Sequence, residues 1–189
     1  TLYIGPAGEN LVKYAAIVSE STRAGARSGV GCVMGSKKLK AIAVRGTNMV
    51  PVADEAGMLK MRKEMFDAIE SWNGYDQWRR WGTASMLIAS SDAGSLATKN
   101  YREGTFEQVD KIGAPKAEKE FWVKHRSCFQ CPLHCMKVGE ISTGPYKGTI
   151  AEGPEYETGT LHGSNCLVSD FNGMMKSIAE ADDWGLDSI

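Results

Sequence analysis

The 189-residue sequence lacks a net charge of either sign and lacks a long apolar run. Its 22 Lys and Arg residues nearly balance 23 Asp and Glu residues, for a formal net charge of −1. Such a balance gives no general attraction to nucleic acid or to an anionic membrane surface. No apolar run approaches the roughly 20 residues that cross a bilayer, and no signal peptide pattern opens the chain. We therefore expect no nucleic-acid partner and no membrane span.

Two common nucleotide-binding patterns are also missing, although Arg23–Lys37 is rich in glycine. The stretch has no Gly-Lys-Ser/Thr after a four-residue spacer, and Gly29-x-Gly31 lacks the third glycine of a dinucleotide fingerprint. Glycine still permits positive φ angles and close approach of a ligand, and Arg23 and Arg27 suit phosphate groups. A phosphate-binding loop and a surface turn with solvated basic residues are the two interpretations.

Cysteine is scarce, but three of the five cysteines lie together as Cys128, Cys131 and Cys135, with C-x2-C-x3-C spacing. This grouping favours a reducing compartment over a disulfide scaffold, and three such thiolates can bind a [4Fe–4S] cluster. A structural zinc site usually has a second ligand pair farther along, and none follows. A thioredoxin-type pair needs a preceding strand, whereas Phe121–His125 reads as a helix end. A cluster, a zinc site and coincidental thiols all remain open.

The patterning predicts an α+β protein that is predominantly helical. We expect residues 1–50 to be the C-terminal end of a β-containing domain and residues 51–189 to be a mainly helical, truncated domain. In the first part, residues 15–18 suit either a strand or a helix, residues 23–35 suit a loop, and residues 39–46 suit a strand.

Five helices are expected in the second part. Asp54 is a plausible N-cap of the first, and the Met58, Met61 and Met65 stripe on it is interpreted as core packing. The other helices are expected at about 76–89, at 114–126, from Pro154 onward, and from Ser169 or Asp170 to Gly185, with a loop or hairpin over 139–153.

The last predicted helix carries a carboxylate on its apolar face. Met175, Ile178 and Asp182 are three and four residues apart and lie on one side of a helix. Burying an unpaired carboxylate is costly, so Asp182 needs a partner. With Leu186 and Asp187 it forms D-x-x-G-L-D. Without other information, Asp182 pairs within the core and Asp187 is solvated.

Two further acids, Glu155 and Glu157, lie in the segment Gly153–Thr158. Paired carboxyl groups can transfer protons when one is desolvated. The alternative is that both are exposed first-turn acids favoured by the helix dipole.

Taken together, these segments resemble the aldehyde ferredoxin oxidoreductase family of tungsten and molybdenum enzymes. The resemblance rests on Arg23–Thr47, Cys128–Cys135, Gly153–Thr158 with Gly163–Cys166, and Asp182–Asp187, which occur in the family's order. It implies a bis-pyranopterin that holds tungsten or molybdenum beside a [4Fe–4S] cluster.

The resemblance also implies roles for individual residues. Cys128, Cys131 and Cys135 would be three of four cluster ligands, the fourth lying beyond Ile189, with Cys166 no substitute. The other implied cofactor-binding residues are Arg23, Ala24 and Arg27 for the pterin phosphates and a bridging Mg²⁺, and Asp182, Leu186 and Asp187 for one pterin. Glu157 matches an acidic residue near the metal, with Glu155 and Glu152 as substitutes, and no catalytic role is assigned to His125, His134 or His162.

The implied activity is oxidation of aldehydes to carboxylic acids, with electrons passed to ferredoxin or an electron-transfer subunit. The resemblance also implies a cytoplasmic location. A close variant is the active-site subunit of a tungsten benzoyl-CoA reductase, with an aromatic acyl-CoA substrate. The alternative from another class is a non-catalytic iron–sulfur or zinc module. The chain starts without Met and stops after a turn, so we expect an internal piece of a longer polypeptide, inactive alone.

Overall fold

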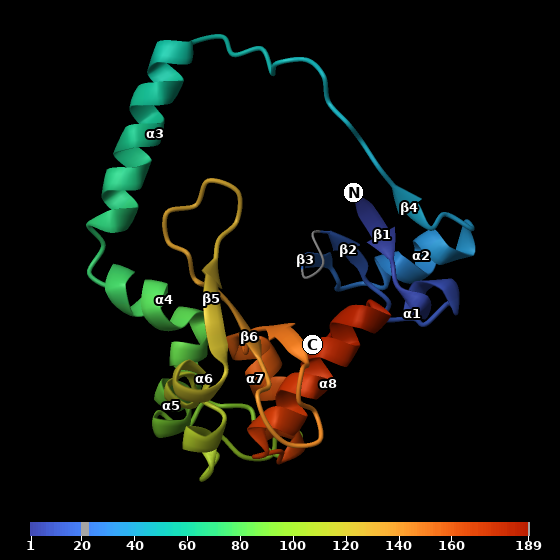
Figure 1. The fold of residues 1–189 in the computed structure, drawn as a ribbon, viewed down its shortest axis with the longest axis vertical. Helices are drawn as coiled ribbons and strands as arrows, with labels where there is room; N and C mark the ends of the chain where they lie inside the picture. The colour runs from blue at the N-terminus through green and yellow to red at the C-terminus, as the bar shows by residue number, and fades with distance from the viewer. Residues whose placement is uncertain (20–22, 189) are drawn as a thin grey trace.

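The computed structural model describes residues 1–19 and 23–188. Helices and strands are mixed and helices dominate, which confirms the α+β prediction. Figure 1 shows a small N-terminal group of elements joined to a larger group by an extended segment that follows β4. None of the described helices combines the length and apolarity needed to span a bilayer.

The N-terminal group is an antiparallel sheet with two short helices. Its strands lie in the order β3-β2-β1-β4. The elements are β1 (Leu2–Ile4), α1 (Pro6–Glu9), β2 (Ile17–Ser19), β3 (Arg23–Gly25), α2 (Val30–Ser36) and β4 (Ala41–Ile42). The residues at 15–18 thus lead into a strand, and the predicted strand at 39–46 is reduced to two residues.

The glycine-rich stretch is a strand followed by a helix, so the prediction of a loop over 23–35 was wrong. A side chain at Gly31 would collide with the backbone of Ala16, and one at Gly35 would collide with the backbone of Gly8. These two glycines are one helical turn apart, so the bare face of α2 packs directly on backbone. Part of the glycine content therefore serves close packing and not a ligand.

The larger group combines helices with a second antiparallel sheet, of order β5-β6-β7. Its elements are α3 (Glu55–Glu70), α4 (Tyr75–Trp81), η1 (Gly82–Ala84), α5 (Ser85–Asp92), η2 (Val109–Lys111), α6 (Ala114–Glu120), β5 (Trp122–Arg126), β6 (Met136–Glu140), β7 (Ile150–Glu152), α7 (Tyr156–His162), η3 (Ser164–Cys166) and α8 (Phe171–Trp184). The predicted hairpin at 139–153 is confirmed as β6 and β7, and Gly144 and Gly148 in its turn have positive φ angles.

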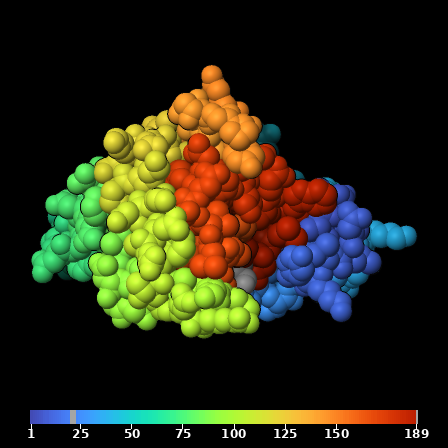
Figure 2. Space-filling model, turned by 90° about the horizontal axis from the view of Figure 1, so that it is seen from below, coloured from blue at the N-terminus to red at the C-terminus, as the bar shows by residue number. Residues whose placement is uncertain are grey.

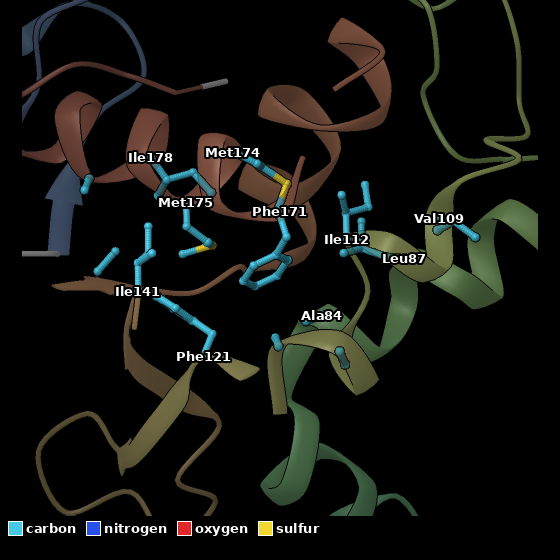
Figure 3. Packing of buried hydrophobic residues seen from close by; sticks show 14 of the residues in the cluster. Ala84, Leu87, Val109, Ile112, Phe121, Ile141, Phe171, Met174, Met175 and Ile178 are labelled. Carbon is cyan, nitrogen blue, oxygen red and sulfur yellow. The ribbon is translucent and has the colours of Figure 1, made fainter. Parts of the chain in front are cut away.

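The core of this group lies between α8, α5, α6 and the second sheet (Figure 3). Phe121 and Phe171 meet edge to face with ring centroids 5.6 Å apart, a favoured aromatic geometry. Met175 and Ile178 of α8 are buried in the same cluster. The core therefore fixes α8, whose C-terminal end reaches the N-terminal group (Figures 1 and 2).

Two helices begin where the sequence predicts. Asp54 caps α3 by accepting from Gly57 N at 2.9 Å, and Asp170 caps α8 by accepting from Asn172 N at 3.2 Å. Gly185 ends α8 in the left-handed conformation. The methionine stripe of α3 was wrongly interpreted, however, because α3 has no buried residue and lines only an open apolar groove beside the cysteine loop.

Three other helix predictions needed correction. The expected helix at 76–89 is broken at Gly82, and the one at 114–126 ends at Glu120, after which β5 pairs with β6. The helix expected to start at Pro154 starts at Tyr156, with Glu155 as its N-cap. A strand therefore precedes Cys128, contrary to the reason for excluding a thioredoxin-type pair.

Candidate functional site

Two motifs from opposite ends of the chain meet at the C-terminal end of α8. Ala16 N donates to Gly185 O at 2.8 Å, and Asp187 N donates to Tyr14 O at 2.9 Å. Arg27 Nε lies 3.3 Å from Asp187 Oδ2. The glycine-rich segment and D-x-x-G-L-D, proposed from sequence to bind one cofactor, are thus parts of one surface.

Two further residues of these motifs, Ala24 and Leu186, also lie in this region. Ala24 is exposed on β3, where it pairs with Val18. Leu186 is half-buried and forms a β-bridge with Ala15.

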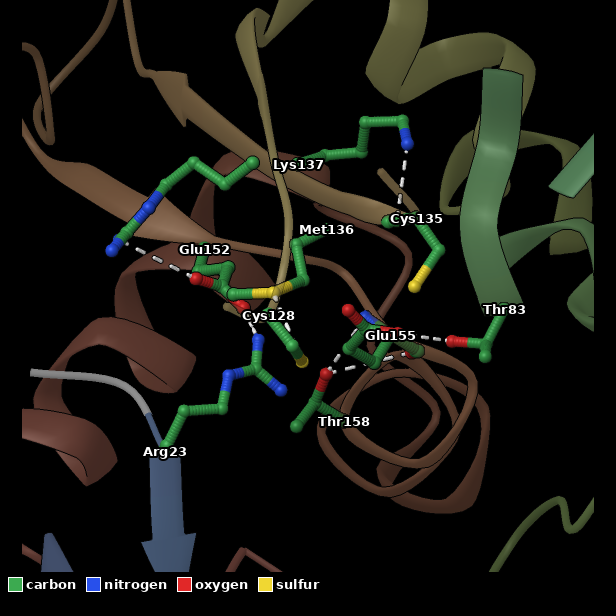
Figure 4. A network of polar contacts seen from close by, with 10 residues as sticks. Arg23, Thr83, Cys128, Cys135, Met136, Lys137, Glu152, Glu155 and Thr158 are labelled. Carbon is green, nitrogen blue, oxygen red and sulfur yellow. Dashed lines mark hydrogen bonds and ion pairs between the residues drawn. The ribbon is translucent and has the colours of Figure 1, made fainter. Parts of the chain in front are cut away.

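Arg23 extends from β3 toward the second sheet (Figure 4). Its guanidinium pairs with the buried Glu152, whose other carboxylate oxygen is 3.7 Å from Arg126 Nη1. The Nε atom of Arg23 is buried and finds no hydrogen-bond acceptor among the described residues. A buried donor without an acceptor is costly, so this atom could donate to a bound ligand.

The carboxyl of Asp182 is the second polar group of interest on this surface. It is half-buried on α8, and burial raises the pKa of its carboxyl to about 6, with a further upward contribution from Asp183 and a downward one from Arg23. No side chain or backbone donor of the described chain bonds to it. A ligand that presents an acceptor to Arg23 Nε and a donor to the Asp182 carboxyl would satisfy both groups.

The three clustered cysteines occupy the turn between β5 and β6. Cys131 N donates to Cys128 O at 3.0 Å, and Gln130 and His134 have φ angles of 56° and 51°. These left-handed residues bend the loop just before Cys131 and Cys135. The thiols are free, and the pKa of Cys135 is raised by burial and by the negative charges of Glu155 and the other two cysteines.

In the described ranges, no three His, Cys, Asp or Glu side chains converge closely enough to hold a single metal ion. By its chemistry, the set of three cysteines suits a [4Fe–4S] cluster, which takes each thiolate on a different iron, and it also suits zinc with a further ligand. No helix starts at Cys128, so a low-pKa thioredoxin-type thiol lacks its usual support.

Glu155 faces this loop from the start of α7. It forms a capping box with Thr158 and accepts a hydrogen bond from Thr83 Oγ1 (Figure 4). Burial raises the pKa of Glu155, while Thr83, Arg23 and Lys137 lower it. The net shift is upward, so the Glu155 carboxyl holds a proton more readily than an exposed glutamate does.

Glu157 is placed elsewhere. It is exposed and lines a pocket of about 600 Å³ between α7 and the segment 94–104. The acids named as substitutes, Glu152 and Glu155, are the ones that lie with Arg23 and the cysteine loop.

Sequence reasoning missed Lys137. This lysine of β6 is 2% exposed, and its Nζ lies 2.9 Å from Arg79 O, 3.2 Å from His134 O and 3.0 Å from Cys135 O. The sequence does contain a feature that could have indicated this residue. It is a lysine two residues after the last clustered cysteine, between the apolar residues Met136 and Val138.

The remaining candidates are peripheral. Cys166 is exposed and donates to Leu161 O at 3.1 Å, away from the cysteine loop. His162 Nδ1 is 2.8 Å from Ser177 Oγ, and burial lowers the pKa of its ring.

Comparison with known proteins identifies the family of this chain. The family model described as aldehyde ferredoxin oxidoreductase, N-terminal domain, matches residues 1–46, and the one for domains 2 and 3 matches residues 58–189. The chain therefore belongs to the aldehyde ferredoxin oxidoreductase family.

Individual relatives agree. The chain is 36% identical over 190 residues to a tungsten-containing aldehyde ferredoxin oxidoreductase of Thermococcus kodakarensis, covering 98% of this chain and 30% of that protein. It is 35% identical to the protein of the same name from Pyrococcus furiosus, with the same coverage. The WOR-like subunit of an aliphatic sulfonate oxidoreductase from Pyrococcus furiosus is 32% identical, covering 100% of this chain and 30% of the relative. The chain thus spans about 30% of the length of these relatives.

A solved structure shares the fold. The active site complex BamBC of benzoyl coenzyme A reductase, in complex with 1,5 dienoyl-CoA, aligns with a TM-score of 0.70 at 22% identity. The alignment covers 99% of this chain and 29% of that chain.

Proposed function

We propose that this chain is part of a tungsten- or molybdenum-bis-pyranopterin oxidoreductase with a [4Fe–4S] cluster, which oxidises aldehydes to carboxylic acids and passes the electrons to ferredoxin. The observation that carries the proposal is the buried Arg23 Nε, which has no acceptor among the described residues. The half-buried Asp182 carboxyl, whose pKa burial raises to about 6, belongs to the other of the two motifs that meet at α8.

The residues present suit the implied groups. Arg23 and Arg27 would bind the pterin phosphates, with the Ala24 carbonyl at the bridging Mg²⁺. Asp182 and Asp187 would accept hydrogen bonds from one pterin ring, with Leu186 contributing at the same turn. Cys128, Cys131 and Cys135 would bind the cluster.

When bound, the metal–pterin group supplies the two-electron redox chemistry and the cluster carries electrons onward. The protein's own contribution is to orient the substrate and to manage a proton. We assign the proton to a Glu155 carboxylate oxygen, because its surroundings raise its pKa and Thr83 fixes its position. Glu157, exposed on the next turn, is the competing candidate.

An aldehyde is the favoured substrate because the relatives at 34–36% identity are named aldehyde ferredoxin oxidoreductases. The test is anaerobic reduction of a viologen dye by the full protein, with aldehydes, an aromatic acyl-CoA and an aliphatic sulfonate supplied separately. Aldehyde-dependent reduction supports the proposal. Turnover with only one of the other two substrates would overturn the assignment of an aldehyde, and no turnover by a fully metallated protein would overturn the proposed activity.

A further inference from the structure

Lys137 is the only buried side chain with a formal positive charge in the part of the chain that the structure describes. Three carbonyl oxygens surround its Nζ within hydrogen-bond distance, those of Arg79, His134 and Cys135. Three acceptors require three N–H donors, which an ammonium has and a neutral amine lacks. The three contacts therefore fit an ammonium, while burial lowers the pKa of Lys137 and the negative charges of Cys135 and Glu155 raise it in part.

These contacts hold the cysteine loop in place. Arg79 O belongs to the last turn of α4, whose carbonyls lack partners within the helix and favour a cation. Lys137 thus ties the end of α4 to the backbone of His134 and Cys135. Gly82 strengthens the contact, because its missing side chain leaves room for the Cys135 carbonyl.

The same geometry places a positive charge beside the last clustered cysteine. Glu155 and Cys135 are the acidic groups whose charges act on Lys137, and the ring of Trp122 lies 5.8 Å from Nζ. Charges interact more strongly in a protein interior than in water. A fixed cation here therefore stabilises added negative charge at the loop.

We propose that Lys137 is a positioning residue that fixes the Cys135 end of the cysteine loop and raises the reduction potential of the cluster. The inference rests on the proposed function, since it requires a cluster on these cysteines. A cluster held by these cysteines would carry one electron at a time. Lys137 would act on it through its position beside Cys135, where it contacts the backbone carbonyl.

The test is a redox titration of the cluster, followed by its electron paramagnetic resonance signal, in the full protein purified anaerobically. Lys137→Met removes the charge and all donors, Lys137→Gln removes the charge but keeps two donors, and Lys137→Arg keeps the charge. Lys124→Met is the matched control, because it removes an exposed lysine from the neighbouring strand β5. Iron content and far-ultraviolet circular dichroism establish that each variant is loaded and folded.

In the neutral variants we expect the ratio of reduced to oxidised cluster at a fixed potential to fall at least about tenfold, or about 59 mV for a one-electron couple. Lys137→Arg and Lys124→Met should stay near the wild-type value. Neutral variants that fold but lose iron, while Lys137→Arg keeps it, would also support the proposal through the loop.

Two results would overturn it. One is an unchanged potential in a loaded neutral variant. The other is loss of folding in both neutral variants, because Lys137 would then serve the stability of the β6 region and not the cluster. Wild-type protein without iron would instead refute the proposed function itself, so the two failures are distinguishable.

Discussion

At the scale of single residues, two buried or half-buried polar groups mark the site, Arg23 Nε and the Asp182 carboxyl. The sequence indicated each residue as a candidate for a different reason. Asp182 was found from helical periodicity, because it shares a face with Met175 and Ile178. The pairing of Arg23 with Glu152 is not visible in the sequence, because 129 residues separate the two side chains.

The raised pKa of Asp182 predicts a pH-dependent stability. Because the folded-state pKa is about 6 and the ordinary value is 3.8, the folded state binds more protons between these values. Asp182 therefore makes the free energy of unfolding fall as pH rises from about 4 to about 6. The loss is at most about 3 kcal/mol, and less because solvent screens a half-buried group.

Asp182→Asn should remove that part of the pH dependence and stabilise the cofactor-free protein near pH 7. Urea unfolding of both proteins at pH 4.5 and pH 7 measures it. An equal pH dependence in the two proteins would show that Asp182 does not have the assigned pKa. The same variant should weaken pterin binding if Asp182 accepts a hydrogen bond from the ring.

The two acids of α7 can be separated by matched variants. Glu155→Gln should lower kcat by about 100-fold if its carboxyl handles the proton, and Glu157→Gln should lower it less, because that side chain points into a different pocket. Steady-state kinetics with an aldehyde, at equal metal content, compares them. A larger loss for Glu157→Gln would move the proton to Glu157.

At the scale of elements, capping signals predicted the structure better than composition did. Asp54 and Asp170 start α3 and α8 as expected, and Gly185 stops α8. The strand β5 was missed because its pairing partner β6 lies beyond the cysteine loop. Trp122 and Val123 favour strands, in agreement with the observed β5, but this short local signal was outweighed by the helical pattern of the residues before it.

Gly82 shows why a long predicted helix breaks. Its φ is 57°, and a side chain there would meet the Cys135 carbonyl. Gly82→Ala should therefore lower the free energy of unfolding by about 1–3 kcal/mol and reduce iron uptake. Gly94→Ala is the matched control, since Gly94 has a φ of 69° but no atom within 4 Å of the added carbon. Equal losses in the two variants would remove the steric role of Cys135.

At the scale of the whole molecule, the chain is organised around contacts between its N-terminal group and the end of α8. Spacing alone could not predict that Arg27 and Asp187 meet, because they are 160 positions apart in the sequence. The family resemblance predicted that both residues bind the cofactor. It also led to the assignment of Glu157 as the acid near the metal. The contacts of Lys137 and Glu155 came only from the folded chain.

These contacts predict that a cut in the extended segment leaves the two parts associated. Arg45 is exposed between β4 and α3, so brief trypsin treatment should cleave after it. The fragments should elute together in gel filtration, because backbone hydrogen bonds at Ala16 and Asp187 and the Arg23–Glu152 ion pair join them. Separate elution would contradict the contact between the two groups.

The most direct test of the central claim is metal analysis of the full protein, purified anaerobically after growth with tungsten and molybdenum supplied. The account predicts about four iron atoms per chain together with about one atom of tungsten or molybdenum. Zinc alone, or iron without either heavy metal, would contradict it and leave a simple metal-binding module.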